Sequence, residues 1–126
     1  MVRVPMESDV LVHTIEDAGG VIYAKSNTPE FGAGANTFNE VFGATRNPWN
    51  TKLSAAGSSG GAAAALATGM AWLAHGSDMG GSLRNPASFC GVVGLRPSPG
   101  RVATDPGNKV DRLLSVEGPM ARNVED

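Results

Sequence analysis

Hydrophobic and polar positions follow two different periods along the first 24 residues. Apolar residues between Leu11 and Ile15 recur at helical spacing, after Ser8 as a capping residue and before the glycine pair 19–20. This pattern predicts a helix over about residues 9–18. The short β-branched run at residues 21–24 predicts a buried strand that follows the helix directly. A helix followed at once by a strand is typical of an α/β fold.

A second helix and strand are predicted in the middle of the chain. Residues 61–68 are almost all alanine, which favours a helix and adds little bulk, and Gly69 is typical of the position just beyond a helix. The apolar run at residues 70–74 then predicts a buried strand, whose end delivers the segment 76–82 to a loop at the edge of the sheet. Active sites of open α/β sheets lie at such edges.

The other segments carry weaker patterns. Thr28-Pro29-Glu30 predicts a helix of about one turn. Residues 36–54 have few periodic apolar positions and are predicted to be mostly loop, with Trp49 and Phe42 available to pin it. Three further elements are predicted toward the C-terminus: a short helix from Ser82, a third strand at residues 92–95, and a turn-rich tail over residues 97–126.

Composition indicates a single globular domain. Of the 126 residues, 41% are hydrophobic and 17% are charged, which is compatible with a packed core. The ten basic and twelve acidic residues are scattered and leave a net charge of −2, so no nucleic-acid-binding or membrane-binding face is predicted. A lone cysteine, Cys90, cannot form an internal disulfide, and neither a metal site nor a cofactor is predicted. No signal peptide or membrane span is evident, so a cytoplasmic location is expected.

Two serines in glycine-rich turns, Ser58 and Ser82, carry the candidate chemistry. They lie 24 residues apart, and Ser58 stands just before the predicted helix, where free N–H groups and the helix dipole favour developing negative charge. Glycine lets the backbone approach a bound group closely enough to donate its N–H groups. A hydroxyl nucleophile needs a proton acceptor beside it and such donors for the oxyanion. The pattern therefore favours acyl transfer.

The residues alone leave other interpretations open. A flexible turn needs no chemistry, and a phosphate-binding loop is disfavoured because no Gly-Lys-Ser/Thr follows and segment 32–34 lacks the dinucleotide spacing. A Ser-His-Asp triad would use His75 or His13, with Asp78 to orient the imidazole. A desolvated neutral lysine is another proton acceptor for a serine. The chain has three lysines, of which the first is expected to be the least exposed: Lys25, Lys52 and Lys109.

A longer set of motifs surrounds these two turns. The set comprises Gly57-Ser58-Ser59-Gly60-Gly61, Gly80-Gly81-Ser82-Leu83-Arg84 and the segment 86–97, with shorter matches at Lys25-Ser26-Asn27, Glu30-Phe31, Asn47-Pro48 and Gly118-Pro119-Met120. Together these segments closely resemble the amidase signature family of amidohydrolases, over nearly the whole chain. The resemblance implies part of an α/β/α sandwich with a mixed central sheet, and amide hydrolysis by a Ser-Ser-Lys triad.

Matched motif by motif, the resemblance also implies roles for individual residues. Ser82 resembles the nucleophile, and Ser58 resembles the bridging serine, which usually follows a cis peptide bond, at Gly57–Ser58 in this chain. The backbone N–H groups that resemble the oxyanion hole are those of Met79, Gly80, Gly81 and Ser82. The residues that resemble the supporting network are Ser59, Asp78 and Arg84. Cys90 falls in a buried structural segment and is expected to be inert.

The chain departs from the family pattern at two points. Ala56 stands where the family usually has glycine, and its methyl group would strain the turn if the position requires a positive φ. The catalytic lysine of the family lies upstream of the segment that resembles residues 21–27, so Lys25 does not inherit that role. Residues 1–126 are therefore expected to be a partial amidase signature domain without the triad lysine or the C-terminal region, and inactive alone.

These features favour an amidase that acts on linear C–N bonds through an acyl-enzyme, giving a carboxylate and ammonia or an amine. A small-molecule amide is the expected partner, nucleic acid and membranes are not, and a homodimer is left open. A glutaminase-type subunit of a tRNA-dependent amidotransferase, a serine hydrolase that uses His75, and a non-catalytic binding module remain the alternatives.

Overall fold

A small antiparallel sheet lies at the centre of the structure. The computed structural model describes residues 5–104 and 111–126. Within these residues, strands β5 (Leu73–Asp78), β7 (Val116–Ala121) and β6 (Val93–Gly94) pair in the order β5-β7-β6, and both pairs are antiparallel. A short helix, α4 (Asp111–Leu114), leads into β7. The strand at the centre of the sheet thus comes from the end of the chain.

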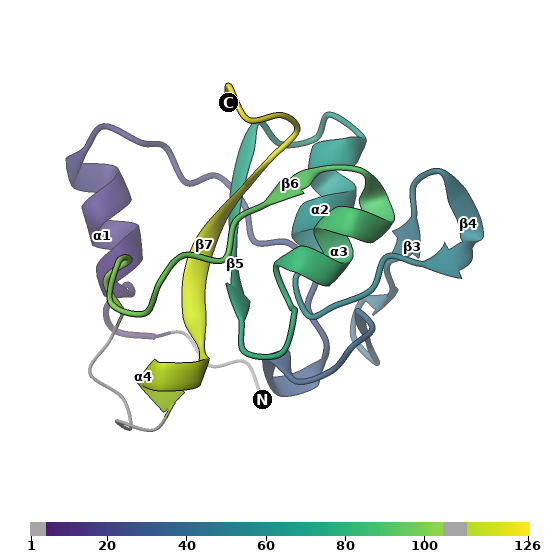
Figure 1. Ribbon diagram of the computed structural model, residues 1–126, viewed down its shortest axis with the longest axis horizontal. Coiled ribbons are helices and arrows are strands. Elements are labelled where there is room, and N and C mark those ends of the chain that lie inside the picture. The colour runs from purple at the N-terminus through teal and green to yellow at the C-terminus, as the bar shows by residue number, and fades with distance from the viewer. Residues whose placement is uncertain (1–4, 105–110) are drawn as a thin grey trace.

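Helices cover both faces of this sheet. Helices α2 (Gly60–Ala67) and α3 (Arg84–Cys90) lie on one side, and α1 (Val10–Asp17) lies on the other (Figure 1). The core forms between the sheet and the α2–α3 pair, from Ala55, Ala62, Ala63, Leu66, Leu83, Ala87, Cys90 and Met120. This layered arrangement of helices and strands is the one predicted from the sequence. No helix within residues 5–104 and 111–126 is long and apolar enough to cross a membrane.

The two long helices form close to where the sequence predicts them. Helix α1 begins one residue later than expected, because its N-cap is Asp9 rather than Ser8: the Leu11 N–H donates to Asp9 Oδ1 at 2.9 Å. Helix α2 ends at Ala67, and Gly69 follows with φ +73°, the left-handed conformation that favours glycine. Alanine side chains let α2 pack closely against the sheet.

The predicted strands at residues 21–24 and 70–74 are corrected by the structure. Residues 21–24 form no strand, and Val21 is 84% exposed. Met70 and Ala71 donate their N–H groups to Ala65 O, at 2.8 and 3.3 Å, so they complete the end of α2 instead of joining the sheet. Strand β5 therefore starts only at Leu73 and includes Gly76, Ser77 and Asp78, which the sequence placed in a loop.

The segment predicted as loop, residues 36–54, contains two small hairpins. Their strands are β1 (Phe38–Asn39) with β2 (Gly43–Ala44), and β3 (Arg46–Asn47) with β4 (Asn50–Ser54). Trp49 pins this region as predicted, since its Nε1–H donates to Cys90 O at 2.7 Å. Phe42 does not, because it is 79% exposed. The predicted single turn is the 3₁₀ helix η1 (Glu30–Gly32), which starts after Pro29 and not after Thr28.

Two glycines make a recess in the sheet that receives Leu83. Gly76 of β5 and Gly118 of β7 are directly paired. A Cβ atom at Gly118 would lie 2.7 Å from Leu83 Cδ1, and one at Gly76 would lie 3.1 Å from Leu83 Cδ2. Leu83 is fully buried and directly follows Ser82. The recess therefore holds the residue next to the predicted nucleophile against the sheet.

We expect Gly118→Ala to lower stability by about 1–3 kcal/mol, because its methyl group would overlap Leu83 and the Leu95 carbonyl in a packed core. The matched control is Gly80→Ala, since a Cβ there meets nothing within 4 Å. Thermal unfolding of the full-length protein measures both. A Gly118→Ala variant with the Tm of the Gly80→Ala variant would contradict the proposed recess.

Candidate active site

The first serine turn connects β4 to α2 and is buried. Ser58 and Ser59 are 4% and 6% exposed, and Ser59 occupies the position that precedes α2. The Gly57–Ser58 peptide bond is cis, as the sequence predicts. Only glycine fits at position 57, because a Cβ atom there would lie 2.9 Å from the carbonyl carbon of Asn36. The turn is thus packed directly against the backbone of the preceding segment.

Ala56 adopts a backbone conformation that alanine rarely takes. Its φ is +58°, in the left-handed region where a Cβ costs an L-residue roughly 1–2 kcal/mol. The sequence identified this position as a departure from the family pattern, and the structure shows that the position requires a positive φ. The surrounding contacts hold the conformation, since the Ala56 carbonyl accepts a hydrogen bond from the Thr37 N–H at 3.0 Å.

The second serine lies in a loop between β5 and α3. This loop, Met79–Ser82, starts at the fully buried Asp78 and ends at Leu83 in the glycine recess. The two serine segments are in direct contact, because the Ser59 N–H donates to the Ser82 carbonyl at 3.3 Å. The structure therefore brings the Ser58 turn and the Ser82 loop together at one end of β5.

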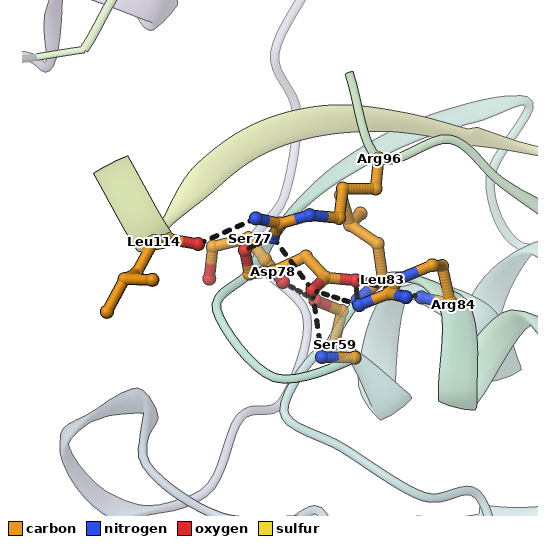
Figure 2. A network of polar contacts seen from close by, with 8 residues as sticks. Ser59, Ser77, Asp78, Leu83, Arg84, Arg96 and Leu114 are labelled. Carbon is orange, nitrogen blue, oxygen red and sulfur yellow. Dashed lines mark hydrogen bonds and ion pairs between the residues drawn. The ribbon is translucent and has the colours of Figure 1, made fainter. Parts of the chain in front are cut away.

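Asp78 is the centre of the polar network that holds this loop (Figure 2). Its Oδ1 accepts the N–H of Gly81 at 2.8 Å, and its Oδ2 accepts those of Leu83 at 3.2 Å and Arg84 at 3.4 Å. The Arg84 guanidinium binds both oxygens, each at 3.0 Å. Arg96 donates to Oδ1 at 3.0 Å and also to the Asp78 carbonyl. One buried carboxylate thus binds two cations and three backbone N–H groups.

These contacts set the charge of Asp78. Burial by itself would raise the pKa of the carboxyl, but the hydrogen bonds from Arg84 and from the backbone N–H groups of Gly81, Leu83 and Arg84 outweigh it. They hold the pKa of Asp78 well below its ordinary value of 3.8. Asp78 in turn raises the pKa of Arg84, through their hydrogen bond and the attraction of opposite charges. Both groups are therefore charged at neutral pH.

Arg96 belongs to this network, although the sequence assigned it no role. Besides Asp78, it donates from Nη2 to the Leu114 carbonyl at 2.8 Å and so connects the serine loop to the start of β7. Its side chain is 24% exposed. The signal available in the sequence is a cation directly between the predicted strand at 92–95 and Pro97.

The predicted oxyanion donors differ in their availability. The Gly81 N–H is already engaged by Asp78 at 2.8 Å, so it does not point freely toward a ligand. The N–H groups of Met79, Gly80 and Ser82 donate to no acceptor among the described residues. Met79 is 54% exposed, which leaves this part of the loop accessible. An oxyanion hole therefore remains a prediction for these three N–H groups, with Gly81 in a supporting position.

The candidate proton acceptors in the described residues lie away from the serines. Gly76 faces Ser59, and successive strand residues point to opposite faces, so His75 lies on the other face of the sheet. There its Nε2 is 3.6 Å from Glu117 Oε2. Asp78 cannot orient His75, because Arg84 and Arg96 occupy its carboxylate. Lys25 and Lys52 are both exposed. Lys109 lies outside the described residues.

Glu117 is a titratable group that the sequence did not single out. Burial raises its pKa, the nearby His75 lowers it, and Asp9 at the start of α1 raises it further. This cluster lies on the α1 face of the sheet, opposite the serine turns. Cys90 is fully buried and burial raises the pKa of its thiol, which agrees with an inert structural cysteine.

Comparison with known proteins identifies the family. The model of the family described as Amidase matches residues 2–126. The chain belongs to the amidase family. It is 45% identical over 123 residues to a subunit of the glutamyl-tRNA(Gln) amidotransferase of Marinomonas sp., a match that covers 98% of this chain and 25% of that protein. It therefore spans about a quarter of the length of this curated relative.

Solved structures of amidases have the same fold as this chain. A structure of 6-aminohexanoate cyclic dimer hydrolase superimposes with a TM-score of 0.85 at 47% identity, over 92% of this chain and 25% of that one. Fatty acid amide hydrolase superimposes with a TM-score of 0.89 at 35% identity, over 98% of this chain and 22% of that one. The α/β fold class predicted from the sequence is thus confirmed.

We expect Asp78→Asn to destabilise the protein by about 3 kcal/mol, the lower end for a broken buried ion pair, because Arg84 reaches solvent. The folded pKa of Asp78 lies below the unfolded value. Its contribution is therefore fully present above about pH 4 and is lost as the pH falls toward the folded pKa. The difference between the wild type and Asp78→Asn should accordingly shrink in acid, which denaturation midpoints across pH 2–7 would measure.

The matched control for this substitution is Asp126→Asn. Asp126 pairs with Arg122 on the surface at 3.6 Å, and such pairs contribute about 0–1 kcal/mol. Equal losses of stability in the two variants would contradict the central role of Asp78.

Proposed function

We propose that the protein carrying this chain hydrolyses amide bonds through an acyl-enzyme on Ser82. The observation that carries the proposal is the loop at the end of β5. Asp78 holds the loop through hydrogen bonds to its backbone. The N–H groups of Met79, Gly80 and Ser82 have no acceptor among the described residues. The buried Ser58 turn is in contact with this loop. Preorganised N–H donors beside a serine hydroxyl are what acyl transfer requires.

In the proposed reaction, Ser82 Oγ attacks the amide carbonyl carbon and forms a C–O bond. Its proton passes to Ser58, whose own proton passes to a base, and the oxyanion is stabilised by the loop N–H groups. The base returns a proton to the departing nitrogen as the C–N bond breaks. Water, whose proton passes through Ser58 to the same base, then attacks the ester carbonyl carbon. The C–O bond to Ser82 breaks, the base returns the proton to Ser82 Oγ, and the carboxylic acid product leaves. No cofactor takes part in these steps.

The proposed base is a lysine that does not belong to residues 1–126. A lysine accepts a proton only when burial favours its neutral form, whereas Lys25 and Lys52 are exposed. The family resemblance also places the triad lysine upstream of the segment 21–27. We therefore propose that residues 1–126 supply both serines and the oxyanion donors, and are inactive by themselves.

The proposed substrate is a small-molecule amide. The names of the similar proteins include a cyclic dimer hydrolase and fatty acid amide hydrolase, and the segment they share with this chain holds the serine turns. A glutaminase subunit of a tRNA-dependent amidotransferase is the second candidate, because the Marinomonas amidotransferase protein is 45% identical to this chain. Release of ammonia from glutamine, compared with release from simple and aryl amides, would separate the two.

We expect a fluorophosphonate probe to label Ser82 in the full-length protein, as peptide mass spectrometry would detect. Ser82→Ala should abolish labelling and lower kcat for an amide by about 10³-fold or more. Activity should rise with pH through the pKa of a desolvated lysine, which must be neutral to act.

Lys25→Ala is the matched control for the base. Lys25 is exposed, so its replacement should change kcat by no more than about threefold, the scale of a surface substitution. Labelling of Ser58 or Ser59 in place of Ser82, or loss of turnover in Lys25→Ala, would overturn the assigned roles.

A further inference from the structure

Helix α2 begins next to the candidate active site without a side-chain cap of its own. Ser59 precedes the helix but makes no capping hydrogen bond within the described part of the chain. The acceptor is supplied instead by Thr37, 23 positions earlier, whose Oγ1 accepts the Gly60 N–H at 3.1 Å. Thr37 is 2% exposed, so this contact is made in the interior. A distant hydroxyl thus does what an N-cap residue ordinarily does.

The same hydroxyl reaches the backbone on both sides of Gly57. Thr37 Oγ1 lies 2.9 Å from the Ala56 carbonyl and 3.3 Å from the Ser58 carbonyl. Because a hydroxyl has one hydrogen, it donates mainly to the nearer oxygen, while its lone pairs accept the Gly60 N–H. The Thr37 N–H also donates to the Ala56 carbonyl at 3.0 Å. One residue therefore contacts the turn at three successive points around Ser58.

These contacts fall where the turn is least able to hold its own shape. Ala56 has a left-handed φ of +58°, which its side chain disfavours, and two hydrogen bonds from Thr37 fix its carbonyl in that conformation. No residue of the turn replaces them, because Gly57 lacks a side chain and the Ser59 hydroxyl reaches toward Ser77 O, at 3.5 Å. The Ser54 hydroxyl accepts the Ala56 N–H at 3.0 Å, but among the described residues only Thr37 donates to the carbonyl oxygens of Ala56 and Ser58. The orientation of these two carbonyls thus depends on Thr37.

We propose that Thr37 is a positioning residue for Ser58 in amide hydrolysis. This inference rests on the proposed function, in which Ser58 relays a proton. Proton relay requires heavy atoms about 2.6–3.2 Å apart, and a displacement of about 1 Å can cost on the order of 100-fold in rate. Removing the Thr37 hydroxyl leaves the Gly60 N–H without its acceptor, frees the Ser58 carbonyl, and leaves the Ala56 carbonyl with only the Thr37 N–H. Ser58 then loses its fixed place in the relay, although Thr37 touches no reacting atom.

The test compares Thr37→Val with Thr37→Ser in the full-length protein. Valine keeps the shape of threonine without the hydroxyl, and serine keeps the hydroxyl. We expect Thr37→Val to lower kcat about 10- to 100-fold, with KM changed less than about threefold, and to slow fluorophosphonate labelling of Ser82 in parallel. Thr37→Ser should restore kcat and labelling to within about threefold of the wild type. A merely structural role would lower the amount of folded protein and leave these rates per folded molecule unchanged.

Thr45→Val is the matched control. Thr45 lies on the same segment, and its hydroxyl accepts from Asn27 Nδ2 at 3.0 Å and makes no hydrogen bond to residues 56–60. Its N–H donates to the Thr37 carbonyl at 2.9 Å, a backbone contact that valine keeps. The Thr45→Val substitution should leave kcat and the labelling rate within about threefold of the wild type. Equal effects of Thr37→Val and Thr45→Val, or a wild-type kcat in Thr37→Val, would overturn the positioning role.

A second comparison covers the case in which Thr37→Val does not fold. Thr37→Cys and Thr37→Ser both lack the methyl group. Their side chains differ in that a thiol is a weaker donor and acceptor than a hydroxyl, and in the larger size of sulfur. Thr37→Cys should be the slower of the two, and equal rates, or failure of both Thr37→Val and Thr37→Cys to fold, would overturn the proposal. If the wild type itself is not labelled at Ser82, the proposed function is wrong. That result is distinct from a failure of the Thr37 proposal, in which the wild type is labelled and the Thr37 variants react at the same rate.

Discussion

The buried carboxylate of Asp78 is the interaction on which the candidate site depends. A charge that is 0% exposed is stable only when it is paired and hydrogen-bonded, and Asp78 meets this requirement with two guanidinium groups and three backbone N–H groups. All three N–H groups belong to the loop and helix start that contain Ser82. Satisfying the carboxylate therefore dictates the path of that backbone. Arg96 extends the constraint to Leu114, so the loop and the approach to β7 are held by one side chain.

Close packing against the sheet supplies the second constraint. Gly76 and Gly118 remove side chains from paired positions, and Leu83 fills the space. Asp78, two residues after Gly76 at the end of β5, holds the same few residues by polar contacts. The hydrogen bonds to Asp78 set the direction of the loop backbone, whereas packing sets how deeply Leu83 enters the recess. Since Ser82 stands between the Asp78-bound Gly81 and the packed Leu83, its backbone has little freedom. This immobility is what preorganised catalysis requires.

The sequence predicts those elements whose signals are local. Helices α1 and α2 follow from a cap, an apolar period and an alanine run, and the two serine turns follow from their glycines. Strand β7 was missed because Gly118 and Pro119 are typical of turns, although in the structure Gly118 makes room for Leu83 and the Pro119 carbonyl accepts the Leu95 N–H at 3.1 Å. Thr37 and Arg96 were missed for a related reason. Their partners lie 18 to 23 positions away, and a single threonine or arginine carries no pattern.

The donors for an oxyanion and the acceptor for a proton have different structural origins in this chain. The donors follow from Asp78 and the short loop after it, within residues 78–84, and from the recess that Gly76 and Gly118 form for Leu83. The acceptor cannot be His75, which faces Glu117 across the sheet from Ser59, and it must be buried to act if it is a lysine. Ser58 is only 4% exposed, so the described residues cover nearly all of its surface. A base that reaches Ser58 is desolvated by the same contacts that hold the turn, which favours the neutral lysine that the proposed mechanism requires.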